Sequence, residues 1–100
     1  MRECYQQRIG PFHASCIDLY AINQHTYMVT RVFTPKKFRG QGFARSLFNK
    51  LLADCDRQQV TLELTVNPYG DMTRNQLAAW YKRLGFVEKP RGFFRREPHV

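Results

Sequence analysis

The chain has 100 residues, of which 43% are hydrophobic, and a formal net charge of +8. This length suits one small domain with its own core and is too short for two, so we expect residues 1–100 to form a single domain. No apolar stretch approaches the ~20 residues needed to cross a bilayer, and the first residues lack the apolar core of a secretion signal. These features argue against a membrane protein and favour a cytoplasmic location.

The net charge indicates the kind of partner, and the cysteines indicate the cellular compartment. A positive surplus favours anionic partners, which include nucleic acid, an acidic membrane surface and a polyanionic cofactor. The three cysteines, Cys4, Cys16 and Cys55, are odd in number and widely spaced, which argues for reduced thiols in a cytoplasm. His13 stands three residues before Cys16, but no second close pair of ligands completes a tetrahedral site, so we predict no metal.

The first third of the chain is typical of β-strands, at residues 3–8, 15–22 and 26–34. Gly10 and Pro11 separate the first two strands, and residues 23–25 form a short hairpin connection. Pro35 then ends strand pairing, because it has no N–H to donate.

A helix is predicted from Phe43 onward, because apolar residues recur at helical spacing while polar residues fill the other face. Its apolar positions are Phe43, Ala44, Leu47, Phe48, Leu51, Leu52 and Cys55. Residues 60–66 then alternate between apolar and polar, which predicts a strand with one apolar face. Thr61, Glu63 and Thr65 form its polar face.

Residues 67–71 have strong turn chemistry, and a second helix follows them. Thr73 and Gln76 have the spacing of a capping box, and Gly85 is placed to end the helix in a left-handed conformation. Residues 86–88 and 92–96 are typical of two short closing strands. The order β-β-β-α-β-α-β-β predicts a mixed α/β fold with at least one parallel strand pair.

The turn before the first helix carries Gly40 and Gly42. Neither residue has a Cβ, so the backbone can approach a bulky anion closely. The helix that follows directs its free N–H groups and the positive end of its dipole at the same place, and Arg39 adds a positive charge. The turn therefore predicts a pyrophosphate-binding site, although a Gly-x-Gly turn is also simply a tight connection.

Two segments together resemble the GNAT superfamily of N-acetyltransferases. Residues 39–44, Arg-Gly-Gln-Gly-Phe-Ala, resemble its Arg/Gln-x-x-Gly-x-Gly/Ala signature, with Pro35 upstream as the family often has it. Residues 78–86, Ala-Ala-Trp-Tyr-Lys-Arg-Leu-Gly-Phe, look like its Leu-Tyr-x-x-x-Gly-Phe segment. Finding both in this order is more specific than finding either. The resemblance implies acetyl-CoA-dependent transfer to an amine, and a mixed central sheet with helices mainly on one face.

The same resemblance assigns the cofactor site, which in this family lies where two parallel strands splay apart. The pantetheine arm would follow the backbone of Val32, Phe33 and Thr34, with Asn67 as a further contact. The backbone N–H groups that would hold the pyrophosphate belong to Arg39, Gly40, Gln41, Gly42, Phe43 and Ala44. An asparagine that the family often carries before its helix tyrosine is Arg74 here, so that contact is not assigned.

The implied reaction is direct attack of an amine, on a protein or a small molecule, on the thioester. Backbone N–H groups near Phe33 and Thr34 would polarise the acetyl carbonyl, and Tyr81 would protonate the departing thiolate. The alternative for Tyr81 is packing in the core with Leu77 and Leu84.

A general base must also take a proton from the amine. Glu63, on the polar face of its strand, is the candidate, and Asp18 lies on an earlier strand. The alternative for both is a solvated surface carboxylate.

Family members usually carry a strand and two helices that wall the acceptor site ahead of the sheet, whereas this chain begins almost at the sheet. We therefore expect an open sheet face that a second subunit, a protein partner or the substrate closes. One alternative is a non-catalytic relative that binds CoA or a partner. Another is a nucleic-acid-binding module, because arginines and Phe93 and Phe94 interleave in residues 91–96. An edge strand with outward charges is the favoured explanation of that segment.

Overall fold

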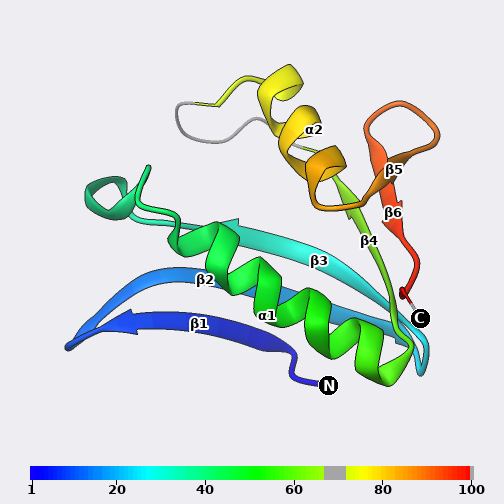
Figure 1. Ribbon diagram of the computed structural model, residues 1–100, viewed down its shortest axis with the longest axis horizontal. Coiled ribbons are helices and arrows are strands. Elements are labelled where there is room, and N and C mark those ends of the chain that lie inside the picture. The colour runs from blue at the N-terminus through cyan, green and yellow to red at the C-terminus, as the bar shows by residue number, and fades with distance from the viewer. Residues whose placement is uncertain (67–71, 100) are drawn as a thin grey trace.

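The computed structural model describes residues 1–66 and 72–99, and its elements follow the predicted order (Figure 1). The strands are β1 (Cys4–Ile9), β2 (Phe12–Asn23), β3 (Thr26–Phe33), β4 (Thr61–Thr65), β5 (Val87–Glu88) and β6 (Phe93–Arg96). The helices are α1 (Phe43–Gln58), α2 (Arg74–Arg83) and a short 3-10 turn, η1 (Lys36–Phe38). β2 begins earlier than predicted, because pairing continues into a tight turn where Ile9 lies opposite Phe12.

All six strands form one mixed sheet in the order β1-β2-β3-β4-β6-β5. The pair β3–β4 is parallel, as the β-α-β connection through α1 predicted. Its ladder has only three residue pairs, from Thr26–Thr61 to Met28–Glu63. Beyond Met28 the two strands separate, and Figure 1 shows them as two sides of a V.

A β-bulge explains why β3 leaves its neighbour. Asp18 lies opposite Arg31 and Leu19 lies opposite Val29, so Thr30 is the extra residue in β3. The Thr30 hydroxyl donates a hydrogen bond to the Asp18 carbonyl at 3.2 Å. A bulge bends its strand and increases the local twist, and the extra residue of this one stands two positions after Met28, the last β3 residue paired with β4.

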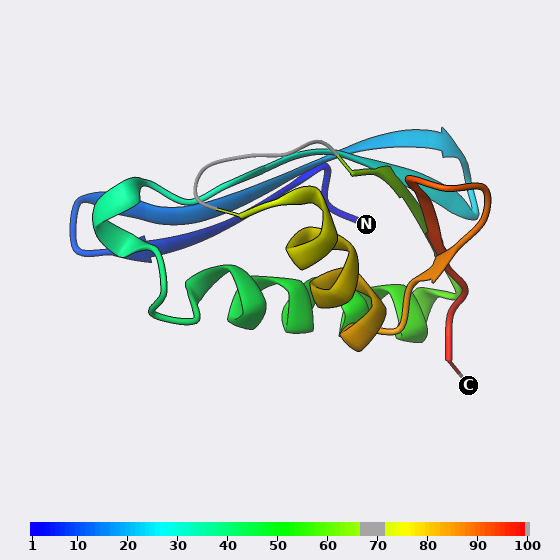
Figure 2. The ribbon, with the colours of Figure 1, turned by 90° about the horizontal axis from the view of Figure 1, so that it is seen from above.

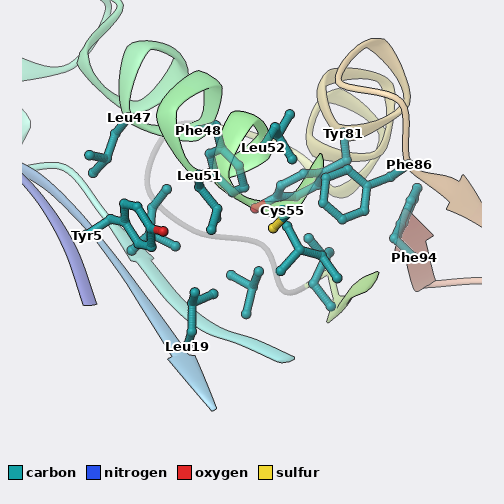
Figure 3. Packing of buried hydrophobic residues seen from close by; sticks show 14 of the residues in the cluster. Tyr5, Leu19, Leu47, Phe48, Leu51, Leu52, Cys55, Tyr81, Phe86 and Phe94 are labelled. Atoms are coloured by element: carbon teal, nitrogen blue, oxygen red, sulfur yellow. The ribbon is translucent and has the colours of Figure 1, made fainter. Parts of the chain in front are cut away.

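Both helices lie on the same face of the sheet, as Figure 2 shows, and this confirms the predicted arrangement. The α1 side chains that point to the sheet are buried, namely Leu47, Phe48, Leu51, Leu52 and Cys55. They meet alternate residues of the strands, including Tyr5, Ile17, Leu19, Leu62, Leu64 and Phe94 (Figure 3). The intervening residues face the other way, where no helix of the described chain covers them. We call this side the bare face.

Helix α2 begins and ends as its sequence predicts. The Thr73 hydroxyl accepts a hydrogen bond from the Gln76 N–H at 3.2 Å, and the Gln76 side chain accepts one from the Thr73 N–H at 2.8 Å. Gly85 follows the helix with φ of +98°, a conformation that favours glycine. The Phe86 N–H then donates to the Tyr81 carbonyl, so the chain folds back and buries Phe86 against the helix.

The C-terminal strand differs from the expected edge strand. β6 pairs with β4 on one side and β5 on the other, and Arg96 is only 4% exposed. Its guanidinium donates two hydrogen bonds to the Asp56 carboxylate, at 2.9 and 3.2 Å, and the His99 N–H donates a third at 2.9 Å. A charged residue at a buried position was not foreseeable, because its partner is 40 residues away in the sequence.

Replacing Asp56 by Asn should lower the free energy of unfolding by about 2–3 kcal/mol at neutral pH, because a buried guanidinium loses its charged partner. The hydrogen bonds from Arg96, with that from the His99 N–H, lower the pKa of Asp56 in the folded protein. A lowered folded pKa stabilises the protein above the unfolded value of about 3.9. This contribution disappears as the pH falls through the folded value.

Urea unfolding at pH values from neutral to about 2 measures the free energies of unfolding of the parent protein and of Asp56→Asn. The gap between the parent protein and Asp56→Asn should narrow at the acid end. Glu97→Gln is the control, because Glu97 is 74% exposed and lies 3.8 Å from its partner Arg95. A gap that stays constant at every pH would contradict the role given to Asp56.

Candidate active site

A cleft of about 830 Å³ lies where β3 and β4 separate. This volume is typical of small-molecule sites. Its walls come from residues 29–34 of β3 and the following turn, from residues 64–66 at the end of β4, and from the start of α1. Helix α2 closes one side with Leu77, Trp80 and Tyr81. The strand pairing, the turn and both helices thus meet at one place.

The cleft is lined from both faces of the sheet. Val32 lies opposite Ile17, whose side chain is buried under α1, so Val32 points to the helix side. Arg31 and Phe33 are its neighbours in β3 and therefore point to the bare face. All three residues line the cleft. An opening between two separated strands therefore connects the helix side with the bare face.

The glycine turn forms the end of the cleft next to α1. Gly40 has φ of +76° and Gly42 has φ of +81°. A Cβ at either position would meet no atom within 4 Å, so the left-handed conformation, and not crowding, requires glycine here. Gly42 is the N-cap of α1, and within the described chain no side chain caps this end and its first turn has no acidic residue. The free N–H groups and the positive helix end fit an anion such as pyrophosphate.

The arginine and glutamine of this turn have different surroundings. Arg39 lines the cleft, and its Nε donates a hydrogen bond to the Thr34 carbonyl at 2.9 Å. It therefore ties the turn to the end of β3. Gln41 is outside the cleft lining, and its side chain donates to the Lys37 carbonyl at 3.1 Å. The predicted contact of Gln41 with a ligand uses its backbone N–H and does not need this side chain.

A buried hydroxyl pair fixes the end of β3. The hydroxyl oxygens of Ser15 and Thr34 lie 3.0 Å apart, and Ser15 also donates to the Phe33 carbonyl at 3.3 Å. Both hydroxyl residues are buried. Sequence reasoning missed Ser15, although a serine within the otherwise apolar residues 14–17 was a usable signal. The pair holds the backbone of Phe33 and Thr34, two predicted site residues, against β2.

Tyr81 belongs to both the core and the cleft. It is 7% exposed, and its ring contacts those of Phe48, Phe86 and Phe94, as Figure 3 shows. Among the described residues, none forms a hydrogen bond with its hydroxyl. Burial raises the pKa of Tyr81 to about 12. The ring therefore packs in the core, as the alternative expected, and Leu77 and Leu84 pack against the same cluster. Tyr81 also lines the cleft.

The family of the protein follows from a comparison with known domains. The model of the acetyltransferase (GNAT) domain matches residues 14–97, which is most of the chain. The chain belongs to the GNAT acetyltransferase family. A search of curated protein sequences gave no significant match.

Several solved structures share this fold. The ribosomal-protein-S18-alanine N-acetyltransferase from Escherichia coli superposes with a TM-score of 0.78 at 17% identity, over 95% of this chain and 68% of that one. The anti-CRISPR protein AcrVA5 gives 0.70 at 14% identity, over 94% and 98%. A GNAT acetyltransferase from Elizabethkingia anophelis with acetyl-CoA bound gives 0.69 at 15%, over 97% and 75%. At such identities the likeness shows the fold alone.

Of the remaining predicted residues, only Glu63 is described, and it lies apart from the cleft. Glu63 is on the bare face in the last β3–β4 pair, and its Oε2 accepts a hydrogen bond from Arg95 at 2.9 Å. It is not part of the cleft lining. Asn67 lies outside the described residues. Within the described chain, no three His, Cys, Asp or Glu side chains gather as metal ligands, and no helix is long and apolar enough to cross a membrane.

The glycine turn yields a prediction with a matched control. Gly42→Ala should lower stability by about 1–2 kcal/mol, because alanine is strained at positive φ. It should also weaken binding of inorganic pyrophosphate, since relief of the strain rotates the N–H groups at the start of α1. The thermal shift on adding pyrophosphate measures the binding.

Gly10→Ala is the control for this effect. Gly10 also has a positive φ, +56°, and its Cβ would also meet open space, but it lies outside the cleft. The control should lose similar stability and keep the full thermal shift. Equal loss of the shift in both variants would mean that the turn at Gly42 does not bind the anion.

Proposed function

We propose that the protein is an N-acetyltransferase that transfers the acetyl group of acetyl-CoA to an amine by direct attack. The observation that carries this proposal is the cleft between β3 and β4. It has an uncapped helix start at α1 that is suited to an anion, and a buried, protonated phenol from α2 on its wall. Family membership supports acetyl transfer in general.

The chain offers the cofactor mainly backbone groups. Bound acetyl-CoA supplies an activated acetyl thioester. Its pyrophosphate would lie at the start of α1, against the N–H groups of Arg39, Gly40, Gln41, Gly42, Phe43 and Ala44. Its pantetheine arm would follow Val32, Phe33 and Thr34, with Asn67 as a further proposed contact. The edge of β3 toward β4 is suited to this role, because the β3–β4 ladder ends at Met28.

In the proposed reaction, the acceptor amine enters from the bare face. Backbone N–H groups near Phe33 and Thr34 polarise the acetyl carbonyl. The nitrogen forms a bond to the carbonyl carbon while the carbon–sulfur bond breaks, and the Tyr81 hydroxyl gives its proton to the sulfur. A Tyr81 pKa of about 12 keeps this hydroxyl protonated at neutral and moderately alkaline pH. A proton donor in this position needs that form.

Glu63 is the proposed general base. It stands in the last residue pair before β3 and β4 separate, on the face from which the amine would enter. Because the Arg95 guanidinium holds its carboxylate outside the cleft lining, the amine proton would reach it through water. We also propose a cytoplasmic location, which suits the free thiols of Cys4, Cys16 and Cys55.

Titration with acetyl-CoA, followed by transfer of labelled acetyl to a panel of amines, tests the proposal. Binding with transfer supports it. Binding without transfer to any amine would identify a non-catalytic CoA-binding relative. No binding, together with salt-dependent binding of DNA, would favour the nucleic-acid module instead.

Tyr81→Phe should lower kcat at least about a hundredfold, the usual effect of losing a general acid. The affinity for acetyl-CoA should stay the same, because phenylalanine keeps the ring contacts and no described residue bonds to the hydroxyl. Calorimetry and steady-state kinetics separate these two effects. Tyr20→Phe is the control, since Tyr20 is 66% exposed and lies outside the cleft. An unchanged kcat in Tyr81→Phe would remove Tyr81 from the proton transfer.

Glu63→Gln should lower kcat at neutral pH and lose less activity at alkaline pH, where more of the acceptor is already the free amine. The pH profile of kcat over KM measures this. Glu97→Gln is the matched control, because Glu97 also pairs with Arg95 but is highly exposed. A profile identical to that of the parent protein would show that Glu63 is not the base.

A further inference from the structure

An arginine that the proposed reaction does not use lies where the cleft reaches the bare face. Arg31 lines the cleft, and 58% of its side chain is exposed. It stands in β3 directly after the bulge at Thr30, opposite Asp18 of β2. Cofactor phosphates would lie at the other end of the cleft, at Gly40 and Gly42. Arg31 is therefore on the side from which an acceptor would approach.

The Arg31 guanidinium is oriented by an aromatic ring and is only loosely paired with a carboxylate. Its central carbon lies 5.0 Å from the centre of the Phe33 ring, a cation–π contact that orients the group. The nearest carboxylate oxygen in the described chain is that of Asp18, 3.9 Å from the nearest guanidinium nitrogen. This distance allows an ion pair but is too long for a hydrogen bond. Most of the five N–H donors thus remain available to an anion.

The charge around the cleft also favours an anionic ligand. The described cleft lining contains three arginines, Arg31, Arg39 and Arg45, and no carboxylate. The sequence between Asp18 and Asp54 holds no Asp or Glu, although it has six Lys and Arg. Phosphate groups of a cofactor would offset the arginines near α1. The charge of Arg31 at the opposite end would repel a cationic acceptor and attract an anionic one.

Resting on the transferase function above, we propose that the acceptor is an amine whose own molecule carries a carboxylate or phosphate near the nitrogen, and that Arg31 binds this anion. The planar guanidinium makes paired hydrogen bonds to either group. This contact orients the neutral amine toward the acetyl carbon. The nitrogen then forms the amide bond, the sulfur leaves with the proton of Tyr81, and the amine proton passes to Glu63 through water.

Matched acceptor pairs test this proposal. Leucine is compared with leucinamide, phosphoethanolamine with ethanolamine, and a peptide starting with Asp with one starting with Asn. We expect kcat over KM to be at least about tenfold higher for the anionic member of one pair. The pair that shows the preference identifies the source of the anion, as a free carboxylate, a phosphate or an acidic side chain.

Arg31→Gln should remove this preference mainly by raising KM for the anionic acceptor, while the neutral acceptor changes little. Arg31→Lys should restore part of it. Asp18→Asn should lower KM for the anionic acceptor, since it removes the carboxylate that competes for Arg31. Arg8→Gln makes the same change of net charge at an exposed position outside the cleft and should keep the preference.

A binding measurement separates this proposal from the transferase function. The anionic amine is titrated into the protein saturated with CoA, and into Arg31→Gln treated in the same way. Binding that depends on Arg31 without any acetyl transfer would support the anion site and contradict the transferase. Transfer without preference for any anionic acceptor, or a preference that survives in Arg31→Gln, would overturn the anion site. Absence of both binding and transfer would overturn the anion site and the transferase function together.

Discussion

The separation of β3 from β4 after three residue pairs is the constraint on which the rest of this molecule depends. A parallel ladder normally continues for the length of its strands, because each unpaired backbone group in a dry interior is unfavourable. Here the bulge at Thr30 turns β3 away as soon as the pairing ends. The opening leaves a backbone edge available along the cleft, and a ligand that follows this edge can replace the missing strand.

An opening in the centre of a sheet needs support from elsewhere. Tyr81 supplies much of it, because its ring contacts Phe48 of α1, Phe86 and Phe94 of β6. These contacts hold α2 over the gap that hydrogen bonds do not close. The same burial that anchors the ring also raises the pKa of Tyr81. The packing of Tyr81 and its raised pKa therefore have one physical cause, and this packing is compatible with the proposed role of Tyr81 in the reaction.

The sequence predicts the features that depend on neighbouring residues. Apolar spacing located α1, Thr73 and Gln76 located the start of α2, and the glycines located the left-handed turn before α1, because each signal lies within a few positions along the chain. Features that depend on pairing across the sheet were not predictable. The bulge at Thr30, the buried pair of Arg96 with Asp56, and the Ser15–Thr34 contact each join segments at least 12 residues apart.

The two halves of the candidate site consequently respond differently to substitution. The proposed cofactor half consists largely of backbone groups, whose positions follow from glycine conformation and helix packing, so few side-chain changes would alter what it binds. The proposed acceptor half consists of side chains on the bare face, such as Arg31 and Glu63, which contribute little to the packed core. Substitution of exposed residues away from the core usually changes stability little. Acceptor preference can therefore change through a few bare-face residues while the fold and the cofactor half stay intact.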